Sequence, residues 1–498
     1  MKFSTPNKFS GIVKFSKDNK YVAFNKGFDV LIYQISNLEL LNTFTYIDEP
    51  KKIEWSFNNA FVMVGLYDRS IVELSLINNN KNNNNNKLCK IDEGYNGIVY
   101  SFLSPLSSKL FIVNEFNLAI KVYDLTNKNI QYLCNLKEGS PEERIKYSLS
   151  KELIAFNHRI ESTDIISIYK ISSNKNNQLN ELNNKNNKLI IEEIDLLCRF
   201  EVNSSVITDC NSLDFTKDEC FILLFDRNIY CNIGIYNILG KLIKHINPYK
   251  HKLGIKNYDL SKSYLAVGFY DNIIRIYHTT SWCLINELNS DDLKIDLNNH
   301  KNKINDVVAF VESNKGFQSV YELKEDCIVD FKVNKEYLLK NDILKCKGIN
   351  YISFSSNGIY LASVKAKSPN VVNIYKAPNF ELYLVVVQLN NISSLNFIKI
   401  SDYSKQDNLS SEEEDKQSIL AITTSNKNIY LVTPNEAYVC PIPLSKKEVI
   451  QIEGVKWGSK ENNLICWDKE YFFLSQMVES EENIEEVSDE DNEDNEDY

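Results

Sequence analysis

The feature that most constrains this chain is a unit of three short apolar segments that recurs along most of its length. Its clearest copy runs from Leu253 to Tyr277, where the polar pair Asp271-Asn272 separates two strand-like runs rich in Ile, Val, Leu and Tyr. Both residues of this pair tolerate a left-handed backbone, which favours a tight turn. The unit therefore reads as an antiparallel meander, which buries too little surface to be stable alone and needs neighbours of the same kind.

The chain supplies nine such copies, which begin near Val13, Ile53, Phe102, Tyr147, Leu213, Ile255, Ile352, Leu395 and Val455. Most copies pair a Ser- or Thr-containing turn after the first strand with an aromatic residue at the end of the third. The anchors at positions 15, 55, 102 and 147 are 40, 47 and 45 residues apart, and Phe215 precedes Tyr258 by 43. In five copies the anchor precedes the final aromatic by 18 to 21 residues, as from Phe15 to Tyr33.

This period predicts an all-β fold, a WD40-type β-propeller of seven to nine four-stranded blades in one large ring. The letters of the repeat are weak, because no copy ends its third strand on a Trp-Asp pair and Tyr123-Asp124 comes nearest. A β-sandwich also has short, evenly spaced strands, but it would not repeat a turn and a terminal aromatic at fixed offsets. For closure of the ring, we expect Phe3 or Phe9 to add a strand beside Tyr471–Leu474. The polar stretch from His278 to Lys347 contains strand-like Val307–Val311, Ser319–Leu323 and Cys327–Val333, and it is expected to hold an outer strand and a long loop.

The predicted propeller spans residues 1–477 and is followed by a disordered acidic tail at 478–498. Four segments interrupt the repeat, and we interpret them as insertions on the surface. Two are Asn-rich, one is long and irregular, and one is acidic: 78–87, 173–188, 289–347 and 402–417.

The charge of the chain is concentrated at one end. The formal net charge is −11, and Glu479–Tyr498 contributes twelve acidic and no basic residues, which leaves about +1 for the rest. A nucleic-acid-binding body would carry a basic excess, so no nucleic-acid partner is expected. The tail is either a solvated appendage or an interaction arm for basic partners. Ser410, Ser411 and Ser488 precede acidic residues and are candidate phosphorylation sites.

The eleven cysteines stand singly, without a Cys-x-x-Cys pair, which suits a reducing compartment. No apolar run reaches the ~20 residues of a membrane span, and MKFSTPNKFSG has no signal-peptide core. We therefore expect a cytosolic or nuclear protein that does not enter a membrane.

Signatures of catalysis and of cofactor binding are missing from the sequence. There is no Gly-x-Ser-x-Gly, no phosphate-binding loop and no Gly-x-Gly-x-x-Gly. His245 and His251 flank Pro248, but no cysteine or acidic cluster joins them to make a metal site. Tyr67-Asp68 and Tyr270-Asp271 stand at equivalent turns of two copies, which favours a structural hydrogen bond over a binding role. The sequence thus predicts a non-enzymatic protein without metal or cofactor.

Several segments resemble one WD-repeat family, the WD repeat-containing protein 8 family of WRAP-type proteins at centrosomes and spindle poles. The most specific are Cys89–Gly94, which reads CKIDEG, and Leu253–Lys256, which reads LGIK. Further segments match in order and spacing: FSGIVKFSKDNKYVAF near the start, Ile53–Ser56, Pro369–Val371 and Glu381–Leu389. The resemblance covers roughly residues 9 to 475, with a poor match around Arg144–Asp209.

The resemblance implies a scaffold that pairs with a coiled-coil adaptor at microtubule-organising centres. The partners it implies are that adaptor, γ-tubulin complex components and a minus-end-directed kinesin, with a role in spindle assembly and microtubule minus-end anchoring. A second hypothesis is a propeller that acts in translation initiation or ribosome association, which would also use a large ring with weak repeat letters. The near-neutral body favours the first hypothesis. A hydrolase is disfavoured because nucleophile motifs are missing.

Overall fold

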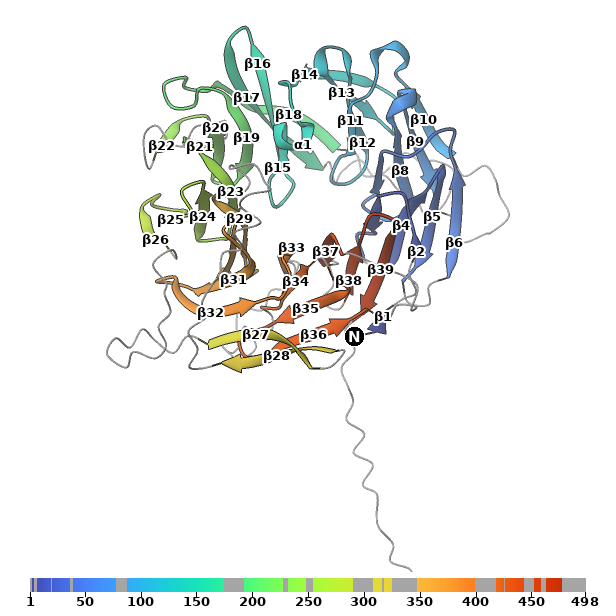
Figure 1. The fold of residues 1–498 in the computed structure, drawn as a ribbon. Coiled ribbons are helices and arrows are strands. Elements are labelled where there is room, and N and C mark those ends of the chain that lie inside the picture. The colour runs from blue at the N-terminus through green and yellow to red at the C-terminus, as the bar shows by residue number, and fades with distance from the viewer. Residues whose placement is uncertain are drawn as a thin grey trace, which may run out of the picture.

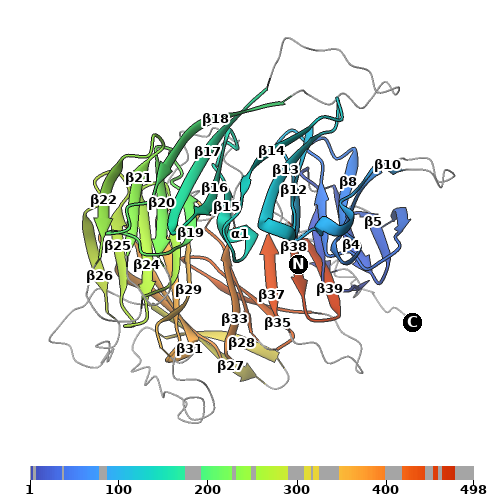
Figure 2. The ribbon, with the colours of Figure 1, turned by 90° about the horizontal axis from the view of Figure 1, so that it is seen from above.

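Nine β-sheets surround a central opening in the computed structural model of the chain (Figure 1). The structure describes residues 2–476 apart from 4–6, 19, 36–38, 78–86, 174–191, 227–231, 248–253, 290–307, 316–317, 325–346, 399–417, 425, 443–451 and 458–462. In the view turned by 90°, the sheets stand side by side around the ring (Figure 2). The chain is therefore a nine-bladed β-propeller, and the predicted fold class is confirmed, at the upper end of the predicted blade number.

In blades 1 to 6 and in blade 8 the strand order follows the sequence from the channel outward, whereas blades 7 and 9 add outer strands from earlier in the chain. Blades 1 to 5 are formed by β3 (Val13–Phe15), β4 (Tyr21–Lys26), β5 (Asp29–Gln34) and β6 (Leu40–Thr45); β7 (Lys52–Trp55), β8 (Phe61–Leu66), β9 (Ile71–Leu76) and β10 (Lys87–Asp92); β11 (Tyr100–Leu103), β12 (Lys109–Val113), β13 (Ala119–Asp124) and β14 (Ile130–Asn135); β15 (Ile145–Tyr147), β16 (Leu153–Ile160), β17 (Thr163–Ser173) and β18 (Glu192–Glu201); β19 (Cys210–Phe215), β20 (Phe221–Asp226), β21 (Ile233–Asn237) and β22 (Leu242–Ile246).

Blades 6 to 9 contain β23 (Ile255–Leu260), β24 (Tyr264–Phe269), β25 (Ile274–His278) and β26 (Leu284–Leu288); β29 (Ile349–Phe354), β30 (Tyr360–Lys365), β31 (Ser368–Lys376) and β32 (Glu381–Val387); β33 (Ile392–Phe397), β34 (Leu420–Thr424), β35 (Asn428–Val432) and β36 (Ala437–Pro441); β37 (Gly454–Trp457), β38 (Asn463–Trp467) and β39 (Tyr471–Gln476). Among the described residues, four short helical segments lie in the connections: η1 (Tyr67–Arg69), η2 (Gly94–Asn96), η3 (Phe116–Leu118) and α1 (Pro141–Arg144).

The N-terminus closes the ring by completing the ninth blade. β1 (Lys2–Phe3) and β2 (Asn7–Lys8) both pair antiparallel with β39. Phe9, just after β2, packs its ring against Phe472 with centroids 5.5 Å apart. The two ends of the described chain thus share one sheet, which confirms the expected closure.

The recurring Ser turn has a direct structural reason. In the turn after the first strand, the Ser or Thr oxygen accepts a hydrogen bond from the backbone N–H that begins the second strand. This bond is 3.0 Å from Tyr21 N to Ser16 Oγ and 2.9 Å from Tyr360 N to Ser355 Oγ. The same bond occurs at Ser56, Ser104, Ser148, Thr216 and Ser261.

Apolar burial and inner-strand hydrogen bonds hold the blades together. A cluster of buried apolar side chains lies at every junction between neighbouring blades. Side chains of the inner strands also bond the backbone of the next blade: Asp259 Oδ2 accepts from Phe354 N at 2.7 Å, and Trp55 Nε1 donates to Lys14 O at 3.0 Å. These contacts join neighbouring blades although most copies lack the usual residues of the WD repeat.

The stretch from His278 to Lys347 differs in part from the expectation. β26 is the expected outer strand, of blade 6, but the stretch also contains a hairpin, β27 (Val308–Lys315) and β28 (Gln318–Lys324). β27 pairs parallel with β32, so blade 7 has six strands. The carboxylate of Glu312 accepts hydrogen bonds from Tyr430 Oη at 2.6 Å and Leu389 N at 2.8 Å, which anchors the hairpin to the ring. The strand-like segments Val307–Val311 and Ser319–Leu323 fall on β27, from Val308 on, and on β28, but their pairing with blade 7 was not predicted, and Val307 and Cys327–Val333 lie outside the described residues.

Candidate functional site

The CKIDEG segment joins blades 2 and 3 through the buried carboxylate of Glu93, which is 6% exposed. Its Oε2 accepts hydrogen bonds from Lys121 Nζ at 2.6 Å and Asn114 Nδ2 at 2.8 Å, and its Oε1 accepts one from Tyr123 Oη. Burial acts to raise the pKa of Glu93, but the bonds from Lys121, Tyr123 and Asn114 outweigh it and lower that pKa. The segment that carries the family resemblance is therefore a structural junction.

Two glycines bend the chain sharply after Glu93 and push the loop tip into solvent. Gly94 and Gly97 have φ of 54° and 63°, which favours glycine. A Cβ on Gly97 would lie 2.7 Å from the Glu115 Cβ, so the loop contacts the η3 connection closely. The tip of this loop, Tyr95 in η2, is fully exposed.

Tyr95 belongs to a row of exposed apolar side chains on one face of the ring, which we call the apolar arc. This face carries the connections from each blade to the next, and we call it the connection face. The arc consists of Phe28 and Ile47, both 57% exposed, Phe116, 70% exposed, and Tyr95. Solvent-exposed aromatic and aliphatic groups in several adjacent loops are typical of protein-interaction sites.

Printed contacts link the loops of the arc one to the next. Tyr46 N donates to Phe28 O at 3.0 Å, beside Ile47. Arg69 Nε lies 3.0 Å from Asp48 Oδ2, and Ser70 O accepts from Glu93 N at 3.0 Å. Glu115 N donates to Gly97 O, which brings the Phe116 loop next to the Tyr95 loop. The four side chains therefore stand on one continuous surface across blades 1 to 3.

The charge on this surface is negative. Arg69 and Lys51 are paired with Asp48 and Asp68, at 3.0 and 3.2 Å. The carboxylates Glu49, Asp92 and Glu115 add to them on the same loops. A partner for the apolar arc should thus offer apolar side chains flanked by basic ones.

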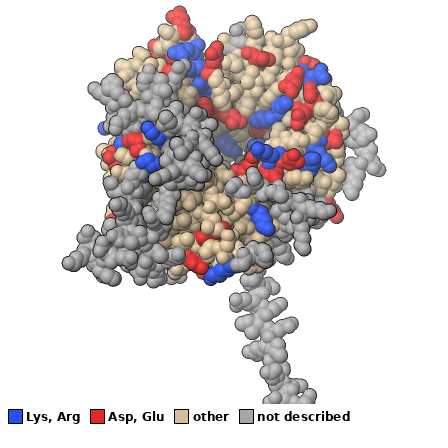
Figure 3. Space-filling model, in the orientation of Figure 1, with Lys and Arg blue, Asp and Glu red and all other residues tan. Residues whose placement is uncertain are grey.

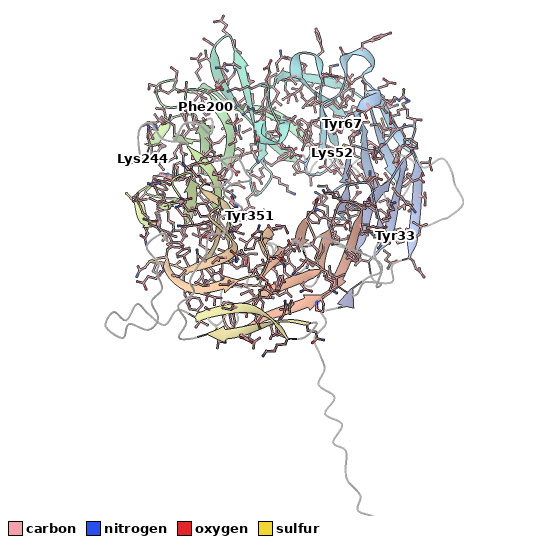
Figure 4. The ribbon with its side chains drawn as sticks, in the orientation of Figure 1. Tyr33, Lys52, Tyr67, Phe200, Lys244 and Tyr351 are labelled. Atoms are coloured by element: carbon pink, nitrogen blue, oxygen red, sulfur yellow. The ribbon has the colours of Figure 1, made fainter. Side chains whose placement is uncertain are left out.

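The central channel is the second surface, and charged side chains surround the hollow at the middle of the ring (Figure 3). Alternate residues of an inner strand face the channel, as in β7, where Lys52 and Glu54 are half-buried while Ile53 and Trp55 are buried. Figure 4 places Lys52 and Tyr351 on opposite sides of the opening. The Lys52 ammonium group lies 3.5 Å from the centroid of the Tyr100 ring, a cation–π contact.

The channel wall is basic along blades 1 to 4 and more acidic along blades 5 and 6. Glu54 is the single carboxylate on the described inner strands β3, β7, β11 and β15, whereas Lys14, Lys52 and Lys146 lie on them. On β19 and β23 the corresponding positions hold Asp214 and Asp259. Burial raises the pKa of Asp214, although Lys146 acts against this rise. One half of the channel is therefore suited to bind anions.

Burial lowers the pKa of Lys52 to about 8, with Lys14 acting in the same direction and Glu54 and Glu142 against it. The pKa of Glu54 is raised by burial, against the opposing effect of Lys52, Lys17 and Lys14. Both groups are thus held in a poorly solvated wall, with 3.9 Å between Lys52 Nζ and Glu54 Oε2.

The LGIK segment has the same kind of role as CKIDEG, at the junction of blades 6 and 7. Lys256 Nζ donates to Lys347 O and Asn350 Oδ1, both at 2.7 Å. Asn272 Oδ1, in the turn after β24, accepts from Gly348 N at 2.7 Å. Asn272 has φ of 67°, which confirms the left-handed turn predicted at Asp271-Asn272. Leu253 lies outside the described residues.

The expected hydrogen bond that holds the turn is present at Asp271, whereas Asp68 makes an exposed ion pair with Lys51. Asp271 Oδ1 accepts from Ile273 N at 3.0 Å, and its Oδ2 lies 2.9 Å from Arg275 Nη1. Asp68 instead pairs with Lys51, while Tyr67 Oη accepts from Ser101 N at 2.9 Å, across to blade 3. The Tyr270-Asp271 turn is thus tied to the start of β25, and the Tyr67-Asp68 turn is tied to blade 3.

A buried ionic cluster between blades 4 and 5 was not foreseen from the sequence. Lys137 Nζ donates to Asp164 Oδ2 at 2.7 Å, to Asp209 and to Cys210 O at 2.8 Å. Arg159 flanks both carboxylates. These residues fall within or beside the segment that matches the family poorly, and no local pattern brings residues 137, 164 and 209 together.

The remaining candidates are two histidines and three serines, most of which lie outside the described residues. His245 is exposed and its Nε2 lies 3.2 Å from Asn232 Oδ1, while His251 lies outside the described residues. Within the described part of the chain, no three His, Cys, Asp or Glu side chains are grouped so that they could hold a metal ion. No helix in that part has the length and apolar character to cross a membrane. Ser410, Ser411 and Ser488 lie in the ranges 399–417 and 477–498, which the structure does not describe.

Comparison with known proteins places one relative along almost the whole chain. WD repeat-containing protein WRAP73 of Mus musculus is 23% identical over 507 residues, and the match covers 97% of each chain. No protein-family model matches the sequence. The chain is therefore similar to WRAP73 from its first blade to its last.

Solved propeller structures are similar at lower identity. Sqt1 of Saccharomyces cerevisiae is 10% identical, with 96% of this chain and 98% of that chain covered and a TM-score of 0.46. Sqt1 of Chaetomium thermophilum, bound to the N-terminus of the ribosomal protein L10, is 10% identical, with 94% and 98% covered and a TM-score of 0.46. The C-terminal WD40 domain of Sif2 is 10% identical, with 89% and 98% covered and a TM-score of 0.43.

Proposed function

We propose that this chain belongs to the WD repeat-containing protein 8 family and is a non-enzymatic scaffold at the microtubule-organising centre or spindle pole. There it would assist spindle assembly and anchor microtubule minus ends. The observation that carries the proposal is the match to mouse WRAP73 over 97% of both chains. Because the match includes all nine blades, the similarity would extend to the arrangement of surface loops around the whole propeller and would not be limited to one part of it.

The structure supports a scaffold through its shape. WD40 propellers typically serve as non-enzymatic protein-interaction platforms. Here the two most specific family segments hold neighbouring blades together, CKIDEG through Glu93 and LGIK through Lys256, and so fix the connection face. A rigid ring of this kind presents loops at constant distances, which is what an assembly factor requires.

The apolar arc is the proposed contact surface for the coiled-coil adaptor. The helices of a coiled coil carry apolar side chains flanked by charged ones. Basic flanks would complement the carboxylates Glu49, Asp92 and Glu115 beside the arc. Through that adaptor the scaffold would reach γ-tubulin complex components and a minus-end-directed kinesin.

The proposed location is the cytoplasm, at the spindle pole, with entry into the nucleus in organisms that divide with a closed nucleus. The test is to tag the chain at its own locus, image it against spindle poles in dividing cells, and identify proteins that co-purify with it. Tubulin-associated proteins and a focus at each pole are expected. A diffuse signal with ribosomal subunits as the main co-purifying proteins would overturn the proposal and favour the alternative in translation initiation or ribosome association.

A further inference from the structure

Four lysines gather on the basic side of the central channel, and we call them the lysine rim: Lys14, Lys17, Lys52 and Lys151. Lys14 and Lys52 lie on neighbouring inner strands, where Trp55 Nε1 donates to Lys14 O. Lys17 lies in the turn after β3, and its backbone N–H donates to Asn59 Oδ1 of the equivalent turn in blade 2 at 3.0 Å. Lys151 lies in the corresponding turn of blade 4. The rim thus extends from the channel wall to the face opposite the connection face.

The inner strands at the rim are short of negative charge, although Asp18 and Glu219 lie on the adjoining turns and Glu142 lies on α1. Glu54 is the single carboxylate among the described inner-strand residues of blades 1 to 4. Burial lowers the pKa of Lys151, and nearby Lys17 lowers it further against the weaker effect of Glu54. Lys14 acts in the same way on Lys52. Like charges held close together destabilise one another, so a bound anion would be stabilised there.

The chain itself supplies a polyanion that begins in the blade next to blade 1, on the face that carries Lys17 and Lys151. β39 starts after a turn on the connection face and ends at Gln476 on the opposite face, the one that carries Lys17 and Lys151. Blade 9 is the neighbour of blade 1, as the 4.7 Å between the Phe24 and Phe472 ring centroids shows. Residues 477–498 follow, with twelve carboxylates and no basic side chain. At about 3.3 to 3.6 Å per residue, these 22 residues reach across the whole face.

We propose that the acidic segment 477–498 binds the lysine rim of its own central channel, entering from the face on which β39 ends. The other charged surfaces do not suit it, since the apolar arc is acidic and Asp214 and Asp259 line the far wall of the channel. A covalent tether keeps the local concentration of the segment high, so weak individual contacts suffice. The segment would thereby keep other anionic peptides out of the channel, and phosphorylation of Ser488 would strengthen this by adding charge. The inference does not depend on the proposed location of the protein.

Cross-linking of the full-length chain tests this directly. A carbodiimide joins a lysine amine to a carboxylate only when the two are in contact, and peptide mass spectrometry identifies the pair. Cross-links from residues 479–497 to Lys14, Lys17 and Lys151 are expected, with at least a fivefold loss at 0.5 M salt, where the screening length falls to roughly 4 Å. Mixing isotopically light and heavy chains separates the two geometries: light–heavy cross-links in place of light–light and heavy–heavy ones would overturn the intramolecular proposal.

Two variants complete the test. The triple change Lys14→Glu, Lys17→Glu and Lys151→Glu should abolish association of the segment with the channel. A matched triple change at exposed lysines elsewhere, Lys26→Glu, Lys51→Glu and Lys90→Glu, should leave it unaltered. Because the first triple removes the cross-linkable amines, the readout is cross-links to Lys52 and Lys146. Equal cross-linking in both triples would refute the proposal.

A further variant leaves the propeller untouched, since it changes only residues beyond β39. Replacing the twelve carboxylates of 479–497 with their amides should make the Lys14 and Lys17 amines several-fold more reactive towards an acylating reagent at low salt. Unchanged reactivity would mean that the segment does not cover the rim.

Discussion

Glu93 and Lys121 form a charge-assisted hydrogen bond across the junction of blades 2 and 3, with 2.6 Å between Oε2 and Nζ. Glu93→Gln removes the charge that the Lys121 ammonium, Asn114 and Tyr123 share. Because Lys121 is partly exposed and can recover water, we expect a loss of about 1–3 kcal/mol in the free energy of unfolding. Urea denaturation measures it, with the exposed Glu143→Gln on α1 as the control. Equal midpoints for the two variants would show that this junction contributes nothing.

The buried Lys137 between blades 4 and 5 should contribute far more to the free energy of unfolding than a surface lysine. Lys137→Met leaves Asp164 and Asp209 with the partly exposed Arg159 as their neighbouring cation. Removing one partner of a buried ion pair costs about 3–5 kcal/mol. The control is Lys51→Met, which breaks the exposed pair with Asp68 and should cost at most about 1 kcal/mol. Similar thermal midpoints for both variants would contradict the burial of this cluster.

The stability of the chain should depend on Lys52 at alkaline pH. The folded-state pKa of Lys52 is lowered to about 8 by burial, so between pH 8 and the ordinary value of 10.5 the unfolded chain binds a proton that the folded chain does not. Stability therefore rises with pH in this window, by up to about 1.4 kcal/mol per pH unit. Denaturant titrations at several pH values should show this rise in the natural chain and its loss in Lys52→Met. Lys26→Met, at the end of β4, controls for the change in net charge, and parallel pH profiles for all three chains would disprove the effect.

The apolar arc should matter for partners and not for folding. Tyr95→Ser combined with Phe116→Ser removes two exposed rings, so stability should change by less than about 0.5 kcal/mol. Recovery of co-purifying proteins should fall at least tenfold if these rings are anchors of the interface. Leu149→Ser with Leu239→Ser, in turns of the opposite face, is the matched control. A control pair that loses the same proteins would place the interface elsewhere.

The sequence predicted the blades because each carries two local signals with a physical origin. One is the Ser or Thr oxygen that caps the turn after the inner strand, as in Ser16 and Ser355. The other is the aromatic residue of the third strand, which follows a shift of register against the outer strand in blades 1, 4, 5, 6 and 7. A β-bulge re-aims a side chain, and these tyrosines pack at the junction with the preceding blade.

The features that the sequence did not predict are contacts and surfaces formed by residues that lie far apart in the chain. Glu192 starts β18, yet its carboxylate accepts hydrogen bonds from Leu106 N at 2.9 Å and Ser108 Oγ at 2.7 Å in the turn after β11. The apolar arc and the lysine rim likewise assemble from strands and loops that lie far apart in the sequence, and no local pattern marks their residues. Only the ring geometry gives them a common surface.

Closure of the ring by the N-terminus gives the last prediction. Phe9 is buried and packs on Phe472, whose ring also contacts Phe24 of blade 1. Phe9→Ala should cost about 3–5 kcal/mol, since it opens a cavity at the point where β2 joins β39. The exposed Phe57→Ala, in the turn after β7, should change stability by less than about 0.5 kcal/mol. Hydrogen exchange locates the effect: the amides of β37, β38 and β39 should lose protection before those of blade 5, because opening the joint frees blade 9 first. Uniform loss of protection around the ring would mean that the blades unfold together and that the N-terminal strands are not its weakest joint.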